Sequence, residues 1–512
     1  MKKYCISFLL FLLLAGNTIV FGQLQTMESL AMKSKILKLE VLFSICLPEN
    51  YYIDNQRFPV VYLLHGLGDD ETSWLEYGRI EQISSQLTGE NQIVPMIYVM
   101  PQGFRCYYSN SYDSNFMYRD MFVNEFVPYI DSMFRTRAER SQRAMIGYSM
   151  GGFGAMMLAL KNPEMFGISV PLSMSVRTDD QYKTEEASGW DQQWGKIFGG
   201  IGKSGNDRIT DFYKQNSPFY VLPEYSNQKV PLIYMVNGDK EETLAKSNEE
   251  LNILMCKLQI EHEYRINEGG HSFKFWNANM PNALRFVSDA FEGKKYRGDF
   301  VQYIEPMPFN EDQMKEVSVN GNTITVFLPV YYHQSSRNYP VIYFVGEFDE
   351  EVSDYDICKV TNVLIKQNVI PEMILVFLRP GDLDDLRKTI KETENQFRIR
   401  KGFRFKALLT YDGQNLLSEV DKDEFRMLVL SEARISTKQI QQLEKDNFER
   451  TSIYLDATQS CWNAEGYGRL HIKLKEKEIK HEYRVRRVNS DYNWFLTGLP
   501  EILKYTAESF HK

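Results

Sequence analysis

A glycine-flanked serine is the clearest chemical feature of this 512-residue chain. The pattern is Gly147-Tyr148-Ser149-Met150-Gly151, and a short apolar stretch precedes it. In such a G-x-S-x-G pattern the serine sits on a strained turn from a strand into a helix, where a Cβ on either glycine would clash. The spacing therefore predicts that Ser149 is a nucleophile at the start of a helix. A serine that only caps an ordinary helix is the alternative.

A serine nucleophile needs a base, an orienting acid and donors for the developing oxyanion. The chain has 7 histidines. His271 lies between Gly269-Gly270 and Ser272-Phe273, on a loop after a predicted strand and before a helix, and it follows Ser149 in the chain. This is the order that serine, acid and histidine take in one class of hydrolases. We therefore predict that His271 is the general base.

The acid should follow the strand predicted over residues 231–236. Asp239, Glu241 and Glu242 all come directly after Gly238, so composition leaves the choice open. An acid in this place would hold the imidazole in the orientation that proton transfer requires.

Two backbone amides are candidates for the oxyanion hole. The amide of Met150 follows the nucleophile directly, and the amide of Leu67 lies in the glycine-rich turn His65-Gly66-Leu67-Gly68 after a buried strand. We interpret His65 as a structural residue that shapes this turn.

The elements that must position these residues follow an alternating pattern. The predicted strands are 37–47, 59–64, 96–100, 143–147, 168–173, 231–236 and 261–266, and the predicted helices are 118–134, 150–160, 243–258 and 279–291. Short apolar runs typify buried strands, and strands that alternate with helices indicate a mostly parallel sheet covered on both faces. The sequence thus predicts an α/β domain over residues 23–293.

The rest of the chain repeats the first unit. After a linker of mixed polarity (294–312), residues 313–512 carry short sequences that match the first unit in the same order. The matched pairs are 58–62 with 339–343, 93–95 with 369–371, 134–137 with 397–400, and 260–265 with 479–484. Four matches in one order favour a duplicated domain over an unrelated α/β domain.

The first unit resembles the esterase D and feruloyl esterase branch of the α/β-hydrolases, which also contains tributyrin esterases and mycolyltransferases. The resemblance covers about residues 35–292 and rests on L-L-H-G-L-G at 63–68, P-Q-G at 101–103, G-Y-S-M-G-G-F-G-A at 147–155 and G-G-H-S-F at 269–273. It implies an α/β-hydrolase fold and a carboxylic ester substrate, with no metal or cofactor.

The resemblance also bears on the acid and on the substrate. In this branch the acid usually lies three residues after a glycine, as in C-G-x-x-D. That position is Glu241 here, a Glu where Asp is usual, and Asp239 stays as the alternative. Arg105-Cys106 stands where feruloyl esterases tend to have a small polar residue, so the acyl group is left open.

A polar segment with two tryptophans lies between Ser173 and Tyr225, where such hydrolases insert a cap over the site. Aromatic rings could stack on an aromatic acyl group or on a sugar. The candidates for substrate binding are Trp74, Tyr107, Trp190 and Trp194. Packing within the cap is the alternative role for these rings.

The second unit has lost the residues that could do this chemistry. In the matched register Ser149 corresponds to Asp412, and His271 corresponds to Ser490 or a residue near it. Gly147 and Gly151 have no glycine counterpart, and the second unit is shorter where the first carries its cap. We therefore predict a degenerate copy without a triad.

Composition and the N-terminus limit the partners and the compartment. The net charge of −9, from 59 basic and 68 acidic side chains, argues against a nucleic-acid partner. Residues 1–22 have the features of a signal peptide: Lys2 and Lys3, an apolar run over residues 6–15, and small residues before Gln23. The remaining cysteines show no C-x-x-C spacing, which makes a zinc site unexpected.

These observations together predict an exported serine carboxylesterase, periplasmic or secreted, that acts on acetyl or feruloyl esters of carbohydrate. Acyl transfer from the same site is one alternative. A non-catalytic protein that binds carbohydrate is the other.

Overall fold

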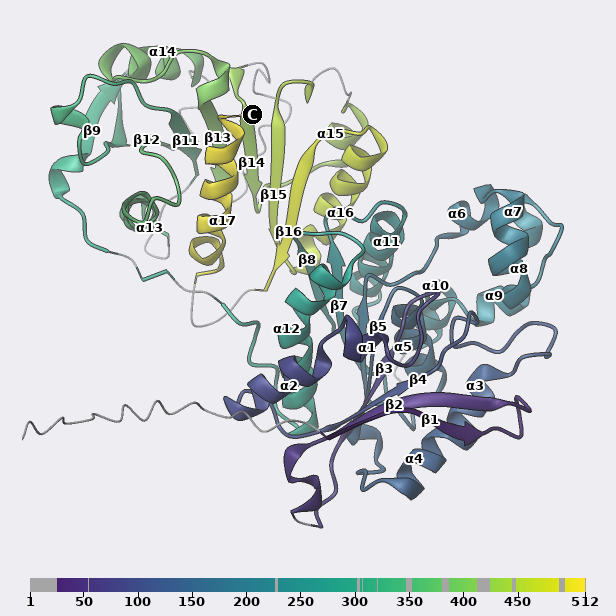
Figure 1. Cartoon of the computed structure of the whole chain (residues 1–512). Coiled ribbons are helices and arrows are strands. Elements are labelled where there is room, and N and C mark those ends of the chain that lie inside the picture. Colours follow the sequence, from purple (N-terminus) through teal and green to yellow (C-terminus); the bar gives the residue numbers. More distant parts are fainter. Residues whose placement is uncertain are drawn as a thin grey trace, which may run out of the picture.

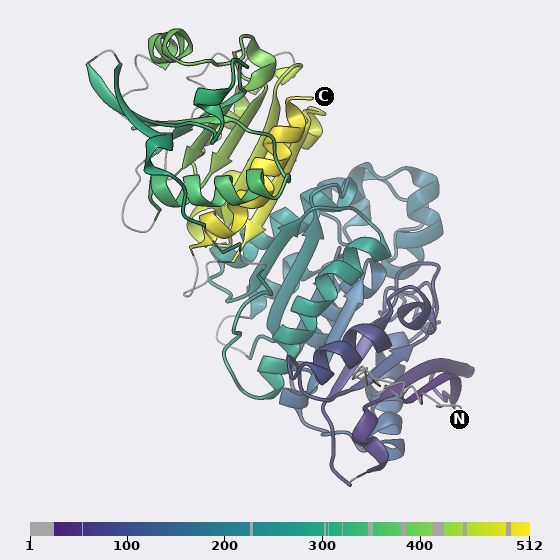
Figure 2. The same cartoon turned by 60° about the vertical axis from the view of Figure 1, so that its left-hand side comes forward.

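The computed structural model describes residues 25–53, 55–225, 229–301, 304–305, 307–319, 321–346, 352–379, 386–411, 424–443, 448–487 and 493–511. In these residues the chain forms two α/β domains that lie end to end (Figure 1, Figure 2). Their strands belong to one 16-stranded sheet.

The strands of the first domain follow the order β1-β2-β4-β3-β5-β6-β7-β8. Their bounds are β1 (Gln25–Lys33), β2 (Glu40–Leu47), β3 (Val60–Leu64), β4 (Ile97–Pro101), β5 (Arg143–Tyr148), β6 (Ile168–Leu172), β7 (Leu232–Gly238) and β8 (Glu263–Asn267). β1 and β2 are antiparallel to their neighbours and the others run parallel. This arrangement confirms the predicted α/β-hydrolase fold.

Most predicted strands nearly coincide with observed ones, and β1 is the strand that the sequence did not predict. Its ladder with β2 shifts register between Met27 and Leu30. Such an irregularity breaks the alternation of buried and exposed residues by which a strand is recognised.

The α-helices of the first domain outside the segment between β6 and β7 are α1 (Ser73–Glu76), α2 (Ile80–Gly89), α3 (Tyr118–Met121), α4 (Val127–Met133), α5 (Met150–Lys161), α11 (Thr243–Lys257) and α12 (Phe273–Phe291). The helix predicted over 118–134 is interrupted by a π-helical turn, Phe122–Phe126. The helix predicted over 279–291 begins earlier, at Phe273, because buried Phe275 and Trp276 anchor its first turn and Pro281 is accommodated inside it.

Alternation along the central strands separates two hydrophobic cores. On β3, Tyr62 and Leu64 pack with α4 and α5 on one face of the sheet. Val61 and Leu63 point to the other face and pack with α2 and α12. Because side chains alternate along a strand, a continuous apolar run such as β3 serves both layers of helices.

A helical insertion, called the cap below, connects β6 to β7. It contains α6 (Asp179–Thr184), α7 (Ala187–Gly189), α8 (Gly195–Phe198), α9 (Asp211–Gln215) and α10 (Pro218–Val221). In Figure 1, α6 to α9 project beside the sheet, on the side away from α2 and α12. The insertion occupies the segment that the sequence predicted as a cap.

The second domain has the same strand order as the first, β9-β10-β12-β11-β13-β14-β15-β16 counted from its outer edge. Its strands are β9 (Met314–Val319), β10 (Asn322–Phe327), β11 (Val341–Val345), β12 (Ile374–Leu378), β13 (Lys406–Tyr411), β14 (Met427–Ser431), β15 (Ser452–Thr458) and β16 (His481–Arg486). Its helices are α13 (Asp354–Lys366), α14 (Leu386–Gln396), α15 (Thr437–Gln441), α16 (Cys461–Glu476) and α17 (Trp494–Ser509).

Local contacts repeat between the domains as well. The guanidinium of Arg135 lies 3.9 Å from the ring centroid of Tyr51, and the Arg135 amide donates to the Tyr51 hydroxyl. Arg398 makes the same two contacts with Tyr332, again at 3.9 Å. Arg135 and Arg398 belong to segments that the sequence matched, and Tyr51 and Tyr332 lie at equal distances before the matched segments 58–62 and 339–343. Asp412 and Ser490, the counterparts of Ser149 and His271, lie outside the described residues.

The domains meet edge to edge. β8 pairs with β16 in antiparallel fashion through Ile266 and Val485, and α11 packs against α16 (Figure 1). Since residues 260–265 match 479–484, Ile266 and Val485 occupy equivalent positions. The two domains are therefore related by an approximate twofold axis near this pair.

Candidate active site

Ser149 lies on the sharp turn between β5 and α5. Its backbone has φ 56° and ψ −118°, a conformation that side-chain-bearing residues rarely adopt. A Cβ on Gly147 would come within 2.1 Å of the Gly151 carbonyl oxygen, and a Cβ on Gly151 within 2.1 Å of the Leu64 carbonyl oxygen. Both glycines are therefore needed for the helix to start so close to β3 and β5, which is the geometry that the motif predicted.

His271 lies between Ser149 and Glu241. Its Nε2 is 3.0 Å from the Ser149 Oγ, and its Nδ1 is 3.1 Å from each carboxylate oxygen of Glu241. The Glu241 side chain is 3% exposed, whereas that of His271 is 40% exposed. A buried carboxylate on Nδ1 leaves the unprotonated Nε2 free to accept the serine proton.

The structure separates the two candidate acids. Asp239 does not contact His271: one of its oxygens accepts from the Gly269 amide at 3.0 Å, and the other pairs with Arg484 of the second domain at 2.6 Å. The acid beside the histidine is thus Glu241, the position that the family resemblance favoured. The sequence around Gly238 does not show which acid faces His271 and which faces Arg484, because Arg484 is far away in the chain.

The two amides proposed for the oxyanion hole lie on segments that touch. Met150 is the first residue of α5, and the first amides of a helix have no acceptor within it. The β3 turn that carries Leu67 packs on this helix, because the Leu64 and His65 carbonyls lie where a Cβ of Gly151 would be. This contact places the two segments that carry these amides next to each other, beside the turn at Ser149.

His65 holds the turn that carries Leu67. Its ring is buried, its Nε2 accepts from the Gly103 amide at 2.7 Å, and its Nδ1 lies 2.8 Å from the Gly66 carbonyl oxygen. Burial lowers the pKa of His65 below its usual value, which favours the neutral ring that these two bonds require. The interpretation of His65 as a structural residue agrees with this environment.

The four aromatic candidates for substrate binding are all buried. Trp74 packs against Tyr148, and the Trp190 indole donates to the Gly200 carbonyl inside the cap. The rings of Tyr107 and Trp194 contact each other at 4.5 Å. In this structure these rings pack the domain and its cap, which is the alternative role that the sequence left open.

Tyr107 nevertheless lies close to the nucleophile. Its hydroxyl is 3.1 Å from the Ser175 Oγ and accepts from Gln193 at 2.7 Å. The amide of Ser175 in turn donates to the Ser149 carbonyl. Burial raises the pKa of Tyr107, so the hydroxyl stays protonated and can donate to Ser175.

Two residues that sequence reasoning missed touch the site. Trp276 stands edge-on to His271, with ring centroids 5.1 Å apart, and its indole donates to the Ser173 hydroxyl at 3.0 Å. It lies on the first turn of α12, five residues after His271, and this closeness in the chain could have indicated it. Arg484 gave no such signal, because it belongs to the other domain.

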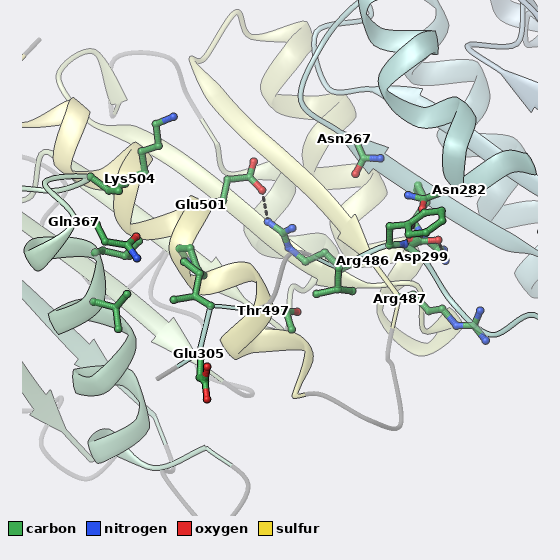
Figure 3. Close-up of a pocket in the computed structure, with 18 of the residues that line it drawn as sticks. Asn267, Asn282, Asp299, Glu305, Gln367, Arg486, Arg487, Thr497, Glu501 and Lys504 are labelled. Atoms are coloured by element: carbon green, nitrogen blue, oxygen red, sulfur yellow. Dashed lines mark hydrogen bonds and ion pairs between the residues drawn. The ribbon is translucent and has the colours of Figure 1, made fainter. Parts of the chain in front are cut away.

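Two hollows lie between the domains. One, of about 690 Å³, lies beside the acid loop and is lined by Asp239, Lys240 and Glu242 together with Lys475 and Glu482 of the second domain. The other, of about 1010 Å³, lies near Arg265 and Arg486 and contains none of the three candidate catalytic residues (Figure 3). The second domain therefore borders the acid loop through the first of these hollows.

The part of the chain that the structure describes lacks the features of a metal site or a membrane span. It contains no cluster of three or more His, Cys, Asp or Glu side chains placed to hold a metal ion. None of its helices is both long and apolar enough to cross a membrane. Cys46, Cys106 and Cys358 are free, and Cys256 is disulfide-bonded.

Comparison with known families agrees with the geometry. The model of the family described as "Putative esterase" matches residues 34–287. The first domain belongs to this esterase family. The match spans the segments that carry Ser149, Glu241 and His271.

Individual relatives of this esterase domain carry related descriptions. An endo-1,4-beta-xylanase/feruloyl esterase of Xylanibacter ruminicola is 35% identical over 135 residues, which are 26% of this chain and 19% of that protein. An acetyl esterase of Caldicellulosiruptor saccharolyticus is 24% identical over 243 residues, 46% of this chain and 85% of that protein. A solved ferulic acid esterase is 22% identical, with a TM-score of 0.45, and covers 52% of this chain and 99% of its own.

Proposed function

We propose that the protein is an exported serine carboxylesterase. The observation that carries this proposal is the single line of contacts from Glu241 through His271 to Ser149. His271 takes the proton of the Ser149 hydroxyl as its oxygen attacks the ester carbonyl. The amides of Leu67 and Met150 stabilise the oxyanion, and the alcohol leaves with the proton from His271.

In the second step the same groups hydrolyse the acyl-enzyme. His271 removes a proton from water, which attacks the acyl group on Ser149. His271 then returns the proton to the Ser149 Oγ as the bond to the acyl carbon breaks and the acid leaves. Because the His271 side chain is 40% exposed, water can reach the acyl-enzyme. This access favours hydrolysis over transfer of the acyl group to another alcohol.

Acetyl or feruloyl esters of carbohydrate are the proposed substrates. Support comes from the two relatives described as a feruloyl esterase and an acetyl esterase. Tyr77, which is exposed, contacts Phe273 two residues after His271 and could stack on an aromatic acyl group or a sugar ring.

Export and duplication are also proposals. The signal-like residues 1–22 lie outside the described residues, and the disulfide at Cys256 is compatible with an oxidising compartment. The equal strand orders of the two domains support duplication. The proposed loss of the triad rests on the sequence alone, with Asp412 and Ser490 in the matched places.

The experiment is an assay of the mature protein against p-nitrophenyl acetate, acetylated xylan and methyl ferulate, with Ser149→Ala as the control. Turnover that this substitution abolishes supports the proposal. Absence of turnover on every ester, or turnover that survives the substitution, contradicts it.

A further inference from the structure

The second domain reaches the acid loop of the first through one buried ion pair. The Arg484 Nη1 lies 2.6 Å from the Asp239 Oδ2, and the two side chains are 3% and 1% exposed. A charge-assisted bond with so little solvent around it is weakly screened and geometrically specific.

Asp239 joins the two loops that carry Glu241 and His271. Its other carboxylate oxygen accepts from the Gly269 amide at 3.0 Å, while the Lys240 amide donates to the Gly269 carbonyl at 2.8 Å. Each contact lies within two residues of a candidate catalytic side chain. The distance between Glu241 and His271 is therefore set partly by what holds Asp239.

Arg484 is itself held rigidly by its own domain. Its Nη2 pairs with Glu482 at 2.9 Å, its Nε with Glu501 at 2.5 Å, and its Nη1 also donates to the Tyr483 carbonyl. Glu501 is fixed further by Arg486 at 2.8 Å, the ion pair drawn in Figure 3. A guanidinium with its donors satisfied in this way is a preorganised anchor rather than a mobile surface charge.

The equivalent contact on the other side of the twofold axis has no carboxylate. Arg265 matches Arg484, and it donates to the side chain of Gln459, which matches Asp239. Of these two contacts, the arginine therefore pairs with a carboxylate at the loop that carries the candidate catalytic acid, and with an uncharged amide at the equivalent loop of the second domain. Either contact, with a carboxylate or with an amide, would be enough to hold the two domains together.

We propose that Arg484 is a positioning residue, which acts through Asp239 to hold Glu241 and His271 at the spacing that catalysis needs. The inference rests on the proposed esterase function for its kinetic readout. It gives the second domain a role in the chemistry of the first without any contact with substrate.

The test compares Arg484→Met, Arg484→Lys and the double variant Asp239→Asn/Arg484→Met in the full chain, with p-nitrophenyl acetate as the probe. Gln459→Ala is the matched control, because it removes the equivalent contact across the same interface. Folding is followed by the melting temperature, and functional sites are counted by titration with a fluorophosphonate. The double variant leaves no unpaired charge at position 239, and Arg484→Lys keeps a cation beside Glu482 and Glu501. These two variants keep the test valid if Arg484→Met does not fold.

We expect kcat per titrated site to fall by about 10- to 100-fold in Arg484→Met and in the double variant, with KM changed less than about twofold. Arg484→Lys should recover part of the loss, and Gln459→Ala should keep kcat within about twofold. A kcat unchanged in the double variant and equal to that of Gln459→Ala would overturn the proposal.

A spectroscopic readout separates this inference from the esterase function. The low-field NMR resonance of the His271 Nδ1 proton, identified by its loss in Glu241→Gln, reports the bond to Glu241 directly. It should shift or broaden in the double variant and stay unchanged in Gln459→Ala. An unchanged resonance in the double variant overturns the positioning role, whatever the assays say about ester turnover.

Discussion

Ile266 of β8 pairs with Val485 of β16, and these two residues hold equivalent positions in the two domains. The sheet is therefore continued across the chain's own approximate twofold axis rather than ended at an exposed edge. Covering an edge strand in this way removes a surface that would otherwise pair with another molecule. It also places Arg484, one residue before Val485, against the acid loop of the first domain.

The nucleophile is tested by Ser149→Ala. The hydroxyl is the group that attacks the ester, and the remaining residues supply little without it, so kcat should fall by at least about a thousandfold. Asp412→Ala, which changes the corresponding residue of the second unit, should leave kcat unchanged. The measurement is ester hydrolysis by variants with equal melting temperatures, and a variant at position 149 that keeps a tenth of the activity would contradict the mechanism.

The two acids should respond differently to neutral substitution. Glu241→Gln removes the charge that orients His271, so kcat/KM should fall by about 10³- to 10⁴-fold. Asp239→Asn weakens only the loop contact with Arg484, and about a tenfold loss is expected. The two kcat/KM values measured side by side decide the point, and the reverse ranking would move the orienting role to Asp239.

The tight turn at the nucleophile can be tested through its glycines. Gly151→Ala brings a Cβ to 2.1 Å from the Leu64 carbonyl oxygen, whereas Gly152→Ala places one 3.0 Å from the Leu172 carbonyl oxygen. The first should therefore cost more stability, about 1–3 kcal/mol beyond the second. Urea unfolding of both variants measures the difference, and equal midpoints would show that β3 can move away from α5.

Glu249 should make the stability of the chain depend on pH. It is fully buried on α11 at the interface with α16, where its Oε2 occupies the space that a Cβ of Gly468 would need. Burial raises the pKa of Glu249 from 4.5 to about 8. Because the folded chain holds this proton more tightly than the unfolded chain, the stabilising effect is complete below pH 4.5 and is lost as the pH rises to about 8.

Glu249→Gln mimics the protonated acid at every pH and so removes this dependence. The melting temperatures of the variant and the wild type should be similar near pH 4.5. At pH 9 the variant should be more stable, by on the order of 5 °C. A difference that does not change between these two pH values would mean that Glu249 is charged in the folded protein.

Local sequence determined the strand–turn–helix unit around Ser149. The glycines at 147 and 151 can be recognised from the chain alone by their spacing around Ser149. The clash at Gly147 is with Gly151 itself, whereas the clash at Gly151 is with Leu64 of β3. The apolar runs of the central strands, and His271 on its glycine-flanked loop, can likewise be recognised from the chain alone. The repeated segments also predicted the second domain's order of elements, since each segment keeps its own hydrophobic pattern.

Tertiary structure decided which carboxylate faces which partner. Asp239 and Glu241 are two residues apart in one polar run, and nothing local tells a buried ion pair from an orienting acid. Arg484 pairs with Asp239, and Glu241 is the acid beside His271. Arg484 reaches this loop only because the two domains join at β8 and β16. The burial of Trp74 and Trp190 was decided in the same way, since the sequence shows an aromatic ring but not the side chains that enclose it.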